Sequence, residues 1–132
     1  MRQQVSTGSA WEDLVGYSRA VRVDDTVHVA GTTAVRDGQV VGVGDAYTQT
    51  KVALEIVTAA LAELGATPRD VVRTRMFVTD ISRWEEVGRA HGEVFGDVRP
   101  AASMLEVAGL IDPDLLVEIE VDAIVPHAGG AR

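Results

Sequence analysis

Carboxylate side chains alternate with apolar residues near the end of this chain. Glu118, Glu120 and Asp122 are separated by single apolar residues, and residues two apart on a β-strand lie on the same face. A carboxylate held in a cleft can position a water molecule for attack on a substrate. A solvated strand face gives the same pattern, so both interpretations stay open. If the face is buried, the three charges repel one another and require a nearby cation.

Arg75 is the leading candidate for that cation. It lies within the apolar segment 70–79, which indicates a strand, and Arg73 projects to the same side of that strand. Arg75 can hold an anionic ligand in a cleft, or it can form a salt bridge to the acidic strand without any ligand role. The salt bridge is the simpler expectation. Arg99, directly before Pro100, is a third cation and is expected at the surface.

Other catalytic chemistry finds little support in the sequence. The histidines, His28, His91 and His127, lack the spacing of metal ligands, and the chain has no cysteine. Ser103 has no nearby His-Asp signature of an activated nucleophile. No phosphate-binding loop is present. We therefore expect no metal and no cofactor.

Length and charge narrow the class of protein. A chain of 132 residues is the size of one domain. No apolar run approaches the ~20 residues that span a bilayer, and no apolar signal segment is found at the start. We expect a cytoplasmic protein without membrane contact. The net charge of −8 repels phosphate backbones, so a nucleic acid partner is not expected.

Turn signals and apolar periodicity define the first half of the fold. Segments 20–23 and 26–30 form a predicted hairpin around Asp24-Asp25, and a second turn is predicted at Asp37-Gly38. Asp45 is the expected N-cap of a long helix that ends near Gly65. A strand over 70–79 follows.

The second half continues with a helix and two strands. Ser82 and Glu85 match a capping box, and the helix is expected to end near Gly96. Its core-facing residues are predicted to be Trp84, Val87, Ala90 and Val94. Strands are expected over 101–107 and 116–125. The predicted order is β-β-β-α-β-α-β-β in one α+β domain over 1–132, with a core of about 16–125 and a frayed tail over 126–132.

The predicted order of elements indicates a mixed sheet with two helices packed on one face. The opposite face of such a sheet would be exposed in a single chain. Alternate residues of the acidic strand, such as Val117 and Ile119, can bury one face beneath the helices. We expect a homo-oligomer to cover the opposite face.

Several short motifs, in order along the chain, resemble the Rid family (reactive intermediate deaminases, YjgF-like). The landmarks are segments 16–21, 27–32, 71–80, 99–101 and 117–120. Each is weak alone, but their order and distances are typical of this family. The resemblance implies a chorismate mutase-like (YjgF-like) fold and a homotrimer with a small-molecule cleft between subunits.

The resemblance also implies roles for individual residues. Glu118 would orient the attacking water, backbone groups near Gly31 would hold the substrate nitrogen, and Tyr17 would line the cleft. Thr32 and Ser103 adjoin these positions and are included in the candidate binding site. In deaminating members an arginine follows Pro-Ala and binds the substrate carboxylate, but here that position is Ala102. Thr32 is a second departure, since many members have Ser-Gly-Gln where this chain has Ala-Gly-Thr.

The family motifs, with alanine at the position of the deaminase arginine, leave three functions open. The first is hydrolysis of an imine or enamine to a carbonyl and ammonia, on a substrate other than simple 2-imino acids or one anchored by Arg75. The second is a non-catalytic, ligand-binding or regulatory homotrimer. The third is an oligomeric scaffold without a ligand. Some members of the family carry a ribonuclease label, which the acidic composition does not support.

Overall fold

The computed structural model describes residues 1–126, and the predicted frayed tail beyond Pro126, with His127, lies outside the described residues. Its strands are β1 (Arg2–Val5), β2 (Ala20–Val23), β3 (Thr26–Thr32), β4 (Val35–Arg36), β5 (Gln39–Val40), β6 (Val71–Val78), β7 (Ala101–Glu106) and β8 (Val117–Ile124). Its helices are α1 (Ala10–Val15), α2 (Ala46–Glu63) and α3 (Trp84–Phe95).

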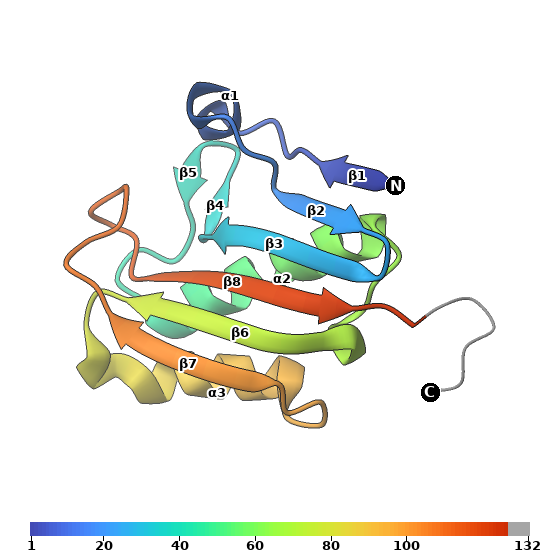
Figure 1. The fold of residues 1–132 in the computed structure, drawn as a ribbon. Coiled ribbons are helices and arrows are strands. Elements are labelled where there is room, and N and C mark those ends of the chain that lie inside the picture. Colours follow the sequence, from blue (N-terminus) through green and yellow to red (C-terminus); the bar gives the residue numbers. More distant parts are fainter. Residues whose placement is uncertain (127–132) are drawn as a thin grey trace.

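The main sheet has six strands in the order β1-β2-β3-β8-β6-β7 (Figure 1). Only the pairing of β6 with the edge strand β7 is parallel. Strands β4 and β5 form a separate small hairpin. The acidic strand β8 lies between β3 and β6, so its side chains have neighbours on both sides.

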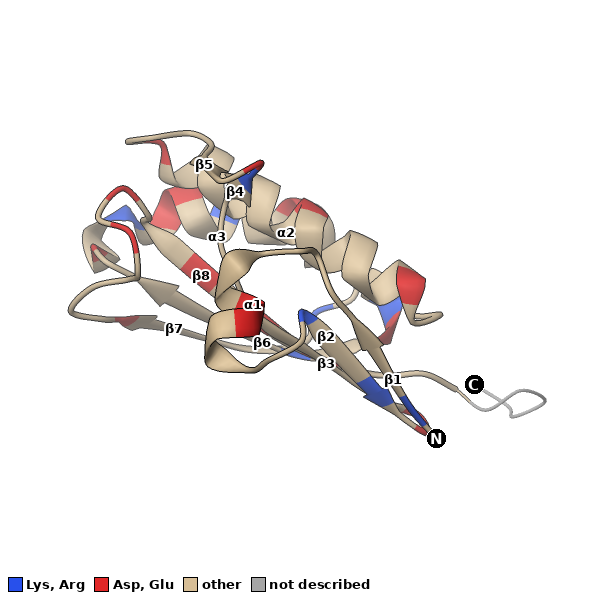
Figure 2. Cartoon of the chain, turned by 90° about the horizontal axis from the view of Figure 1, so that it is seen from above, with Lys and Arg blue, Asp and Glu red and all other residues tan. Residues whose placement is uncertain are grey.

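Helices α2 and α3 lie along one side of the sheet (Figure 2). Helix α2 packs on β3 and β8, and Val57 and Leu61 of its apolar stripe are fully buried. Val117, Ile119 and Val121 project from β8 into the same core, which confirms the predicted assignment of sheet faces. The result is an α+β fold with helices on one face of a mixed sheet.

Buried Gln49 of α2 ties the long loop before β8 to the helix layer. Its amide nitrogen donates to the carbonyl oxygens of Gly42 and Asp114, and its amide oxygen accepts from the backbone N–H of Leu116. Three hydrogen bonds from one fully buried side chain satisfy backbone groups that the loop would otherwise leave unpaired. This anchor sets the point at which β8 enters the sheet.

The predicted hairpin, turn and long helix are confirmed. Asp24 adopts a positive φ of 52° between β2 and β3, and the Asp45 carboxylate accepts a hydrogen bond from the backbone N–H of Thr48 at the start of α2. The sequence did not predict β1 and α1. These elements extend the folded region ahead of Gly16, where the core was expected to begin.

The predicted capping box of α3 is wrong. Asp80, not Ser82, accepts the capping hydrogen bond, from the backbone N–H of Ser82 at 3.0 Å. A 3-10 turn over Ile81–Arg83 follows, and α3 begins only at Trp84. Trp84 is therefore 55% exposed and does not join the core, whereas Val87 and Ala90 are buried as predicted.

The side of the sheet opposite α2 and α3 is called the open face. It carries Glu118, Glu120 and Asp122, which are all half-buried. Two apolar side chains of the same face, Leu105 and Ile124, are 47% and 51% exposed. No helix within residues 1–126 is long and apolar enough to cross a membrane.

Candidate functional site

Arg19 connects three of the residues that the sequence assigned to a binding site. Its guanidinium donates to the carbonyl oxygen of Gly31 at 2.6 Å and to the hydroxyl of Thr32 at 3.1 Å. It also donates to the Tyr17 hydroxyl at 3.2 Å. Arg19 is only 7% exposed, so these contacts are held away from bulk water. Arg19 was not among the site residues predicted from the sequence.

Glu12 of α1 provides the countercharge for Arg19. Its carboxylate lies 4.0 Å from the Arg19 Nε and is 4% exposed. Burial alone would raise the Glu12 pKa, but hydrogen bonds from Thr7 and Ser6, together with the charge of Arg19, lower the pKa below its ordinary value. Glu12 is thus ionised and paired, and α1 fixes the guanidinium in its place.

Gly31 lies at an irregularity in the pairing of β3 with β8. Val29 pairs with Val121 but Thr32 pairs with Ile119, so β3 has one residue more than its partner there. Such a bulge bends a strand and redirects its side chains. A Cβ built at Gly31 would collide with the Glu118 carboxylate, whose Cδ would be 2.8 Å away. Glycine is the residue that lets Glu118 lie directly over this backbone.

Glu118 is a half-buried carboxylate with a raised pKa. Burial is the main cause, the negative charge of Glu120 adds to it, and the positive charge of Arg19 opposes it. No hydrogen bond or ion pair to another of residues 1–126 stabilises the Glu118 carboxylate. A carboxylate of this kind is a stronger base than an exposed one, and its oxygens remain available to a water molecule or a ligand.

Arg75 forms the salt bridge that was the simpler of its two predicted roles. Its guanidinium lies 3.2 Å from Glu120 and 3.3 Å from Asp122. The Asp122 carboxylate also accepts a hydrogen bond from the Nδ1 of His28, at 2.7 Å. Arg75 forms no salt bridge or hydrogen bond with Glu118, so the cation predicted for this acidic face neutralises Glu120 and Asp122 instead.

Ala102 and Ser103 lie on opposite faces of the edge strand β7. Ser103 is paired in register with Arg75 and therefore belongs to the open face. Ala102 is paired with Thr74, which is fully buried on the helix side. Within one chain, Ala102 and Glu118 consequently face opposite sides of the sheet. The structure brings together Tyr17, Gly31, Thr32 and Glu118, and leaves Ala102 apart from them.

A hollow of about 510 Å³ opens beside Tyr17. Residues of β1, α1 and the start of β2 line it, among them Glu12, Gly16, Tyr17 and Ser18. Its size suits a small molecule. Among residues 1–126, no group of three or more acidic, histidine or cysteine side chains is arranged to hold a metal ion.

The α+β fold, with two helices covering one face of a mixed sheet, is shared by several solved structures. A member of the YjgF/YER057c/UK114 family from Mycobacterium tuberculosis superposes with a TM-score of 0.87 and 54% identity, over 95% of this chain and all of its own. The family model described as Endoribonuclease L-PSP matches residues 7–125. The chain therefore belongs to the Rid (YjgF-like) family.

Curated relatives match most of this chain. An uncharacterized protein of Streptomyces coelicolor is 45% identical over 92% of this chain and 90% of its own length. The 3-aminoacrylate deaminase RutC of Acinetobacter baylyi is 34% identical over 80% of this chain and 84% of its own length.

Proposed function

We propose that this protein hydrolyses an imine or enamine to a carbonyl compound and ammonia. The observation that carries the proposal is the half-buried Glu118 carboxylate, which has no partner within residues 1–126 and lies over the backbone of Gly31. A relative named for the deamination of 3-aminoacrylate, which is an enamine, supports the reaction class.

The chemistry requires a positioned water molecule and a proton relay. Water held by Glu118 adds to the carbon of the C=N bond, and the carboxylate takes one proton from it. That proton then passes to the nitrogen and gives a carbinolamine. The carbinolamine hydroxyl loses its proton to the carboxylate, the nitrogen takes this second proton, and the C–N bond breaks as ammonia leaves and the carbonyl forms. An enamine follows the same route once it has tautomerised to its imine. The Gly31 carbonyl oxygen, which Arg19 orients, keeps a second lone pair that can accept from the substrate N–H.

The substrate we propose is not a simple 2-imino acid. The position that carries the carboxylate-binding arginine in the deaminases is Ala102, which has no side-chain donor. Arg75 does not substitute for that arginine because Glu120 and Asp122 already pair with it. The ligand of the cleft is a small metabolite rather than RNA, since a chain with a net charge of −8 repels phosphate backbones.

A homotrimer with the cleft between subunits is part of this proposal. Leu105 and Ile124 leave apolar surface on the open face, which a second copy would bury. Ala102 and Glu118 lie on opposite faces of the sheet in one chain. They can therefore line the same cleft only if each comes from a different subunit. Light scattering should give three times the chain mass of 14.0 kDa.

A non-catalytic, ligand-binding homotrimer is the second candidate. The neutralised Arg75 and the missing donor at Ala102 favour it, because both remove charge that would hold a reacting 2-imino acid.

An imine-hydrolysis assay separates the two candidates. Amino-acid oxidase generates 2-imino acids in place, 3-aminoacrylate serves as the enamine, and ammonia release is compared between the native protein, Glu118→Gln and Ala102→Arg. We expect the native protein to act on the enamine, Glu118→Gln to lose this activity, and Ala102→Arg to gain activity on 2-imino acids. Glu63→Gln, an exposed change on α2, is the control. Native protein that releases no ammonia above the uncatalysed rate from any imine or enamine would favour the binding function.

A further inference from the structure

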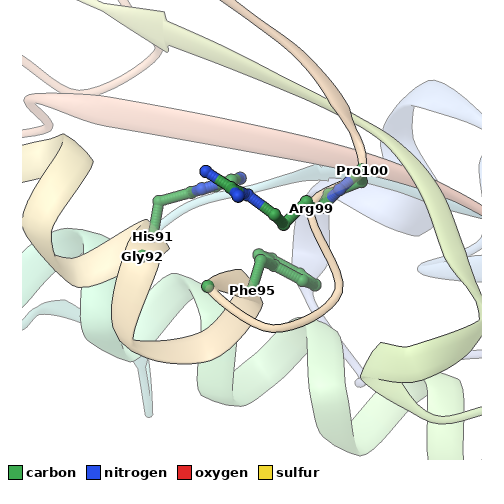
Figure 3. A pocket seen from close by; sticks show the side chains of 6 residues that line it. His91, Gly92, Phe95, Arg99 and Pro100 are labelled. Atoms are coloured by element: carbon green, nitrogen blue, oxygen red, sulfur yellow. The ribbon is translucent and has the colours of Figure 1, made fainter.

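A second, smaller hollow lies at the edge of the sheet, away from Glu118. It measures about 270 Å³ and is lined by His91, Gly92, Phe95, Gly96, Arg99 and Pro100, here called the Arg99 hollow (Figure 3). Its walls are the last turns of α3 and the segment that leads into β7. Figure 3 shows Arg99 and His91 extending toward one another above the ring of Phe95.

Arg99 holds an unusual backbone conformation at this position. Its φ is +56°, and the other non-glycine residues with positive φ within residues 1–126, Asp24 and Asp37, are aspartates in hairpin turns. Short polar residues tolerate this conformation, whereas a long side chain is uncommon there. The backbone N–H of Arg99 donates to the carbonyl oxygen of Phe95 at 2.8 Å, which fixes the turn. A strained residue that keeps a charged side chain points to a function for that side chain.

The guanidinium of Arg99 is available to a ligand. It makes no hydrogen bond or ion pair with any of residues 1–126, unlike Arg19 and Arg75. A guanidinium with free donors binds a carboxylate through two parallel N–H groups.

His91 contributes a polar wall to the hollow. Its Nε2 is engaged with the hydroxyl of buried Thr74 at 2.8 Å, which orients the ring, and its other ring nitrogen has no partner among residues 1–126. The Phe95 ring lies 4.8 Å from the His91 ring, centroid to centroid. Together with Pro100, Phe95 gives the hollow an apolar floor.

The hollow lies beside the position that lacks the deaminase arginine. Thr74, which bonds His91, is paired in register with Ala102. Because His91 and Phe95 belong to the helix layer, the Arg99 hollow opens on the same side of the sheet as Ala102. Arg99 precedes Ala102 by three residues. Its guanidinium is therefore near the position at which the deaminases carry their carboxylate-binding arginine.

From these contacts we infer that the Arg99 hollow binds the carboxylate of a small molecule with an apolar or aromatic body. Arg99 holds the carboxylate, and Phe95 and Pro100 contact the body. In the tautomer whose Nε2 accepts from the Thr74 hydroxyl, the Nδ1–H of His91 donates a further hydrogen bond to the carboxylate. At about 270 Å³ the hollow is slightly smaller than the roughly 300–1,000 Å³ of ordinary ligand pockets, which limits the ligand to a small acid. The further statement that this hollow anchors the substrate in place of the missing arginine rests on the proposed function.

Phenylacetate and its uncharged analogue phenylacetamide form a matched pair of probes. Binding to the intact protein is measured by calorimetry and by NMR shifts of the His91 and Phe95 signals. We expect phenylacetate to bind roughly tenfold more tightly than the amide, as a charge-assisted pair of hydrogen bonds would give. Equal binding of the two probes, or no shift of these signals at millimolar phenylacetate, would overturn the inference.

Two variants test the site itself. Arg99→Asn removes the cation but keeps a residue that tolerates positive φ, and should reduce phenylacetate affinity roughly tenfold. Arg73→Gln removes another exposed arginine, from β6, and should leave affinity unchanged. Gly92→Leu fills the hollow without removing charge, and a Cβ at Gly92 meets no atom within 4 Å, so binding should be lost while the fold is kept. Unchanged binding in Arg99→Asn and Gly92→Leu would rule out the hollow.

Glu118→Gln distinguishes this inference from the proposed function. If phenylacetate binding persists in Glu118→Gln while the native protein hydrolyses no imine, the carboxylate site stands and the proposed reaction fails. If the native protein hydrolyses an enamine but Arg99→Asn changes neither binding nor KM, the reaction stands and the carboxylate site fails.

Discussion

The guanidinium of Arg19 donates a hydrogen bond of 2.6 Å to the carbonyl oxygen of Gly31, twelve residues further along the chain. This contact joins the start of β2 to the bulge of β3, directly beneath the Glu118 carboxylate. It fixes the peptide against which a substrate nitrogen would lie, and the same arginine opposes the effect of burial on the Glu118 pKa. The candidate site is therefore organised by a residue that need not touch the substrate.

Arg19→Ala should destabilise the protein strongly. The change leaves the buried Glu12 carboxylate without its cation and removes three hydrogen bonds, and breaking a buried pair in this way costs about 3–5 kcal/mol. Arg19→Lys keeps the charge but not the planar set of donors, so we expect a smaller loss of about 1–3 kcal/mol. Urea unfolding measures both. Arg36→Lys, at a 49% exposed arginine, should change stability by less than about 0.5 kcal/mol.

Gly31→Ala should affect the site more than the fold. The new methyl group meets the end of the Glu118 side chain rather than backbone, and that side chain can rotate away. We expect a stability change within about 1 kcal/mol, well below the usual cost of overpacking a core, but a large loss of hydrolytic activity because Glu118 leaves its position over the Gly31 peptide. Thermal unfolding and the ammonia-release assay together test this. A variant that retains full kcat would show that the position of Glu118 over Gly31 is not needed.

The sequence predicted the framework of the fold better than the site. Alternation along residues 117–123 correctly separated the buried apolar face from the acidic face, because a strand period of two follows from the backbone alone. The close approach of Gly31 to Glu118 depends on a bulge in the pairing of β3 with β8, and such pairing between distant segments leaves no local signal.

Arg19 and Ala102 show why individual site residues were harder to place. Arg19 stands between Ser18 and Ala20 at the start of a strand, where an arginine is normally exposed. It is buried because α1, which the sequence did not predict, brings Glu12 to it. Ala102 faces the helices because β7 pairs in parallel with β6 in the register that places Ala102 beside Thr74. The sequence of β7 alone does not predict that register. A positive φ at Arg99 is likewise invisible in the sequence, since arginine rarely adopts it.

His91 should make stability depend on pH below neutrality. Burial lowers the pKa of its imidazole, so the folded protein keeps the ring neutral to a lower pH than the unfolded chain does. The stability that this provides is complete above the unfolded pKa of about 6.5 and is lost as the pH falls through it, because the unfolded chain then binds the proton first. His91→Gln keeps a partner for Thr74 without a titrating group.

Urea unfolding of both proteins at pH 7.5 and pH 5.5 measures this effect. The native protein should lose more stability over this interval than His91→Gln does. Identical losses in the two proteins would show that His91 titrates alike in the folded and unfolded states.

Glu118 should oppose stability under the conditions in which it supports the proposed reaction. Burial, with the charge of Glu120, raises the pKa of Glu118 above its ordinary value of 4.5. The folded state therefore binds this proton more tightly than the unfolded chain, and the resulting stabilisation is complete at low pH. It disappears as the pH rises through the folded pKa. At neutral pH the ionised carboxylate is therefore unfavourable for folding.

Glu118→Gln removes that charge while keeping the shape of the side chain. We expect the variant to have a higher melting temperature than the native protein at pH 7.5, with a difference that shrinks toward pH 4.5, and to have lost hydrolytic activity at both values. In the native protein, activity should instead rise with pH as the base is deprotonated. Glu63→Gln, at an exposed position of α2, should change neither property. A Glu118→Gln variant less stable than the native protein at pH 7.5 would mean that the carboxylate has a stabilising partner in the assembled protein, most directly a donor from a neighbouring subunit, and the assignment of Glu118 as an available base would then fail.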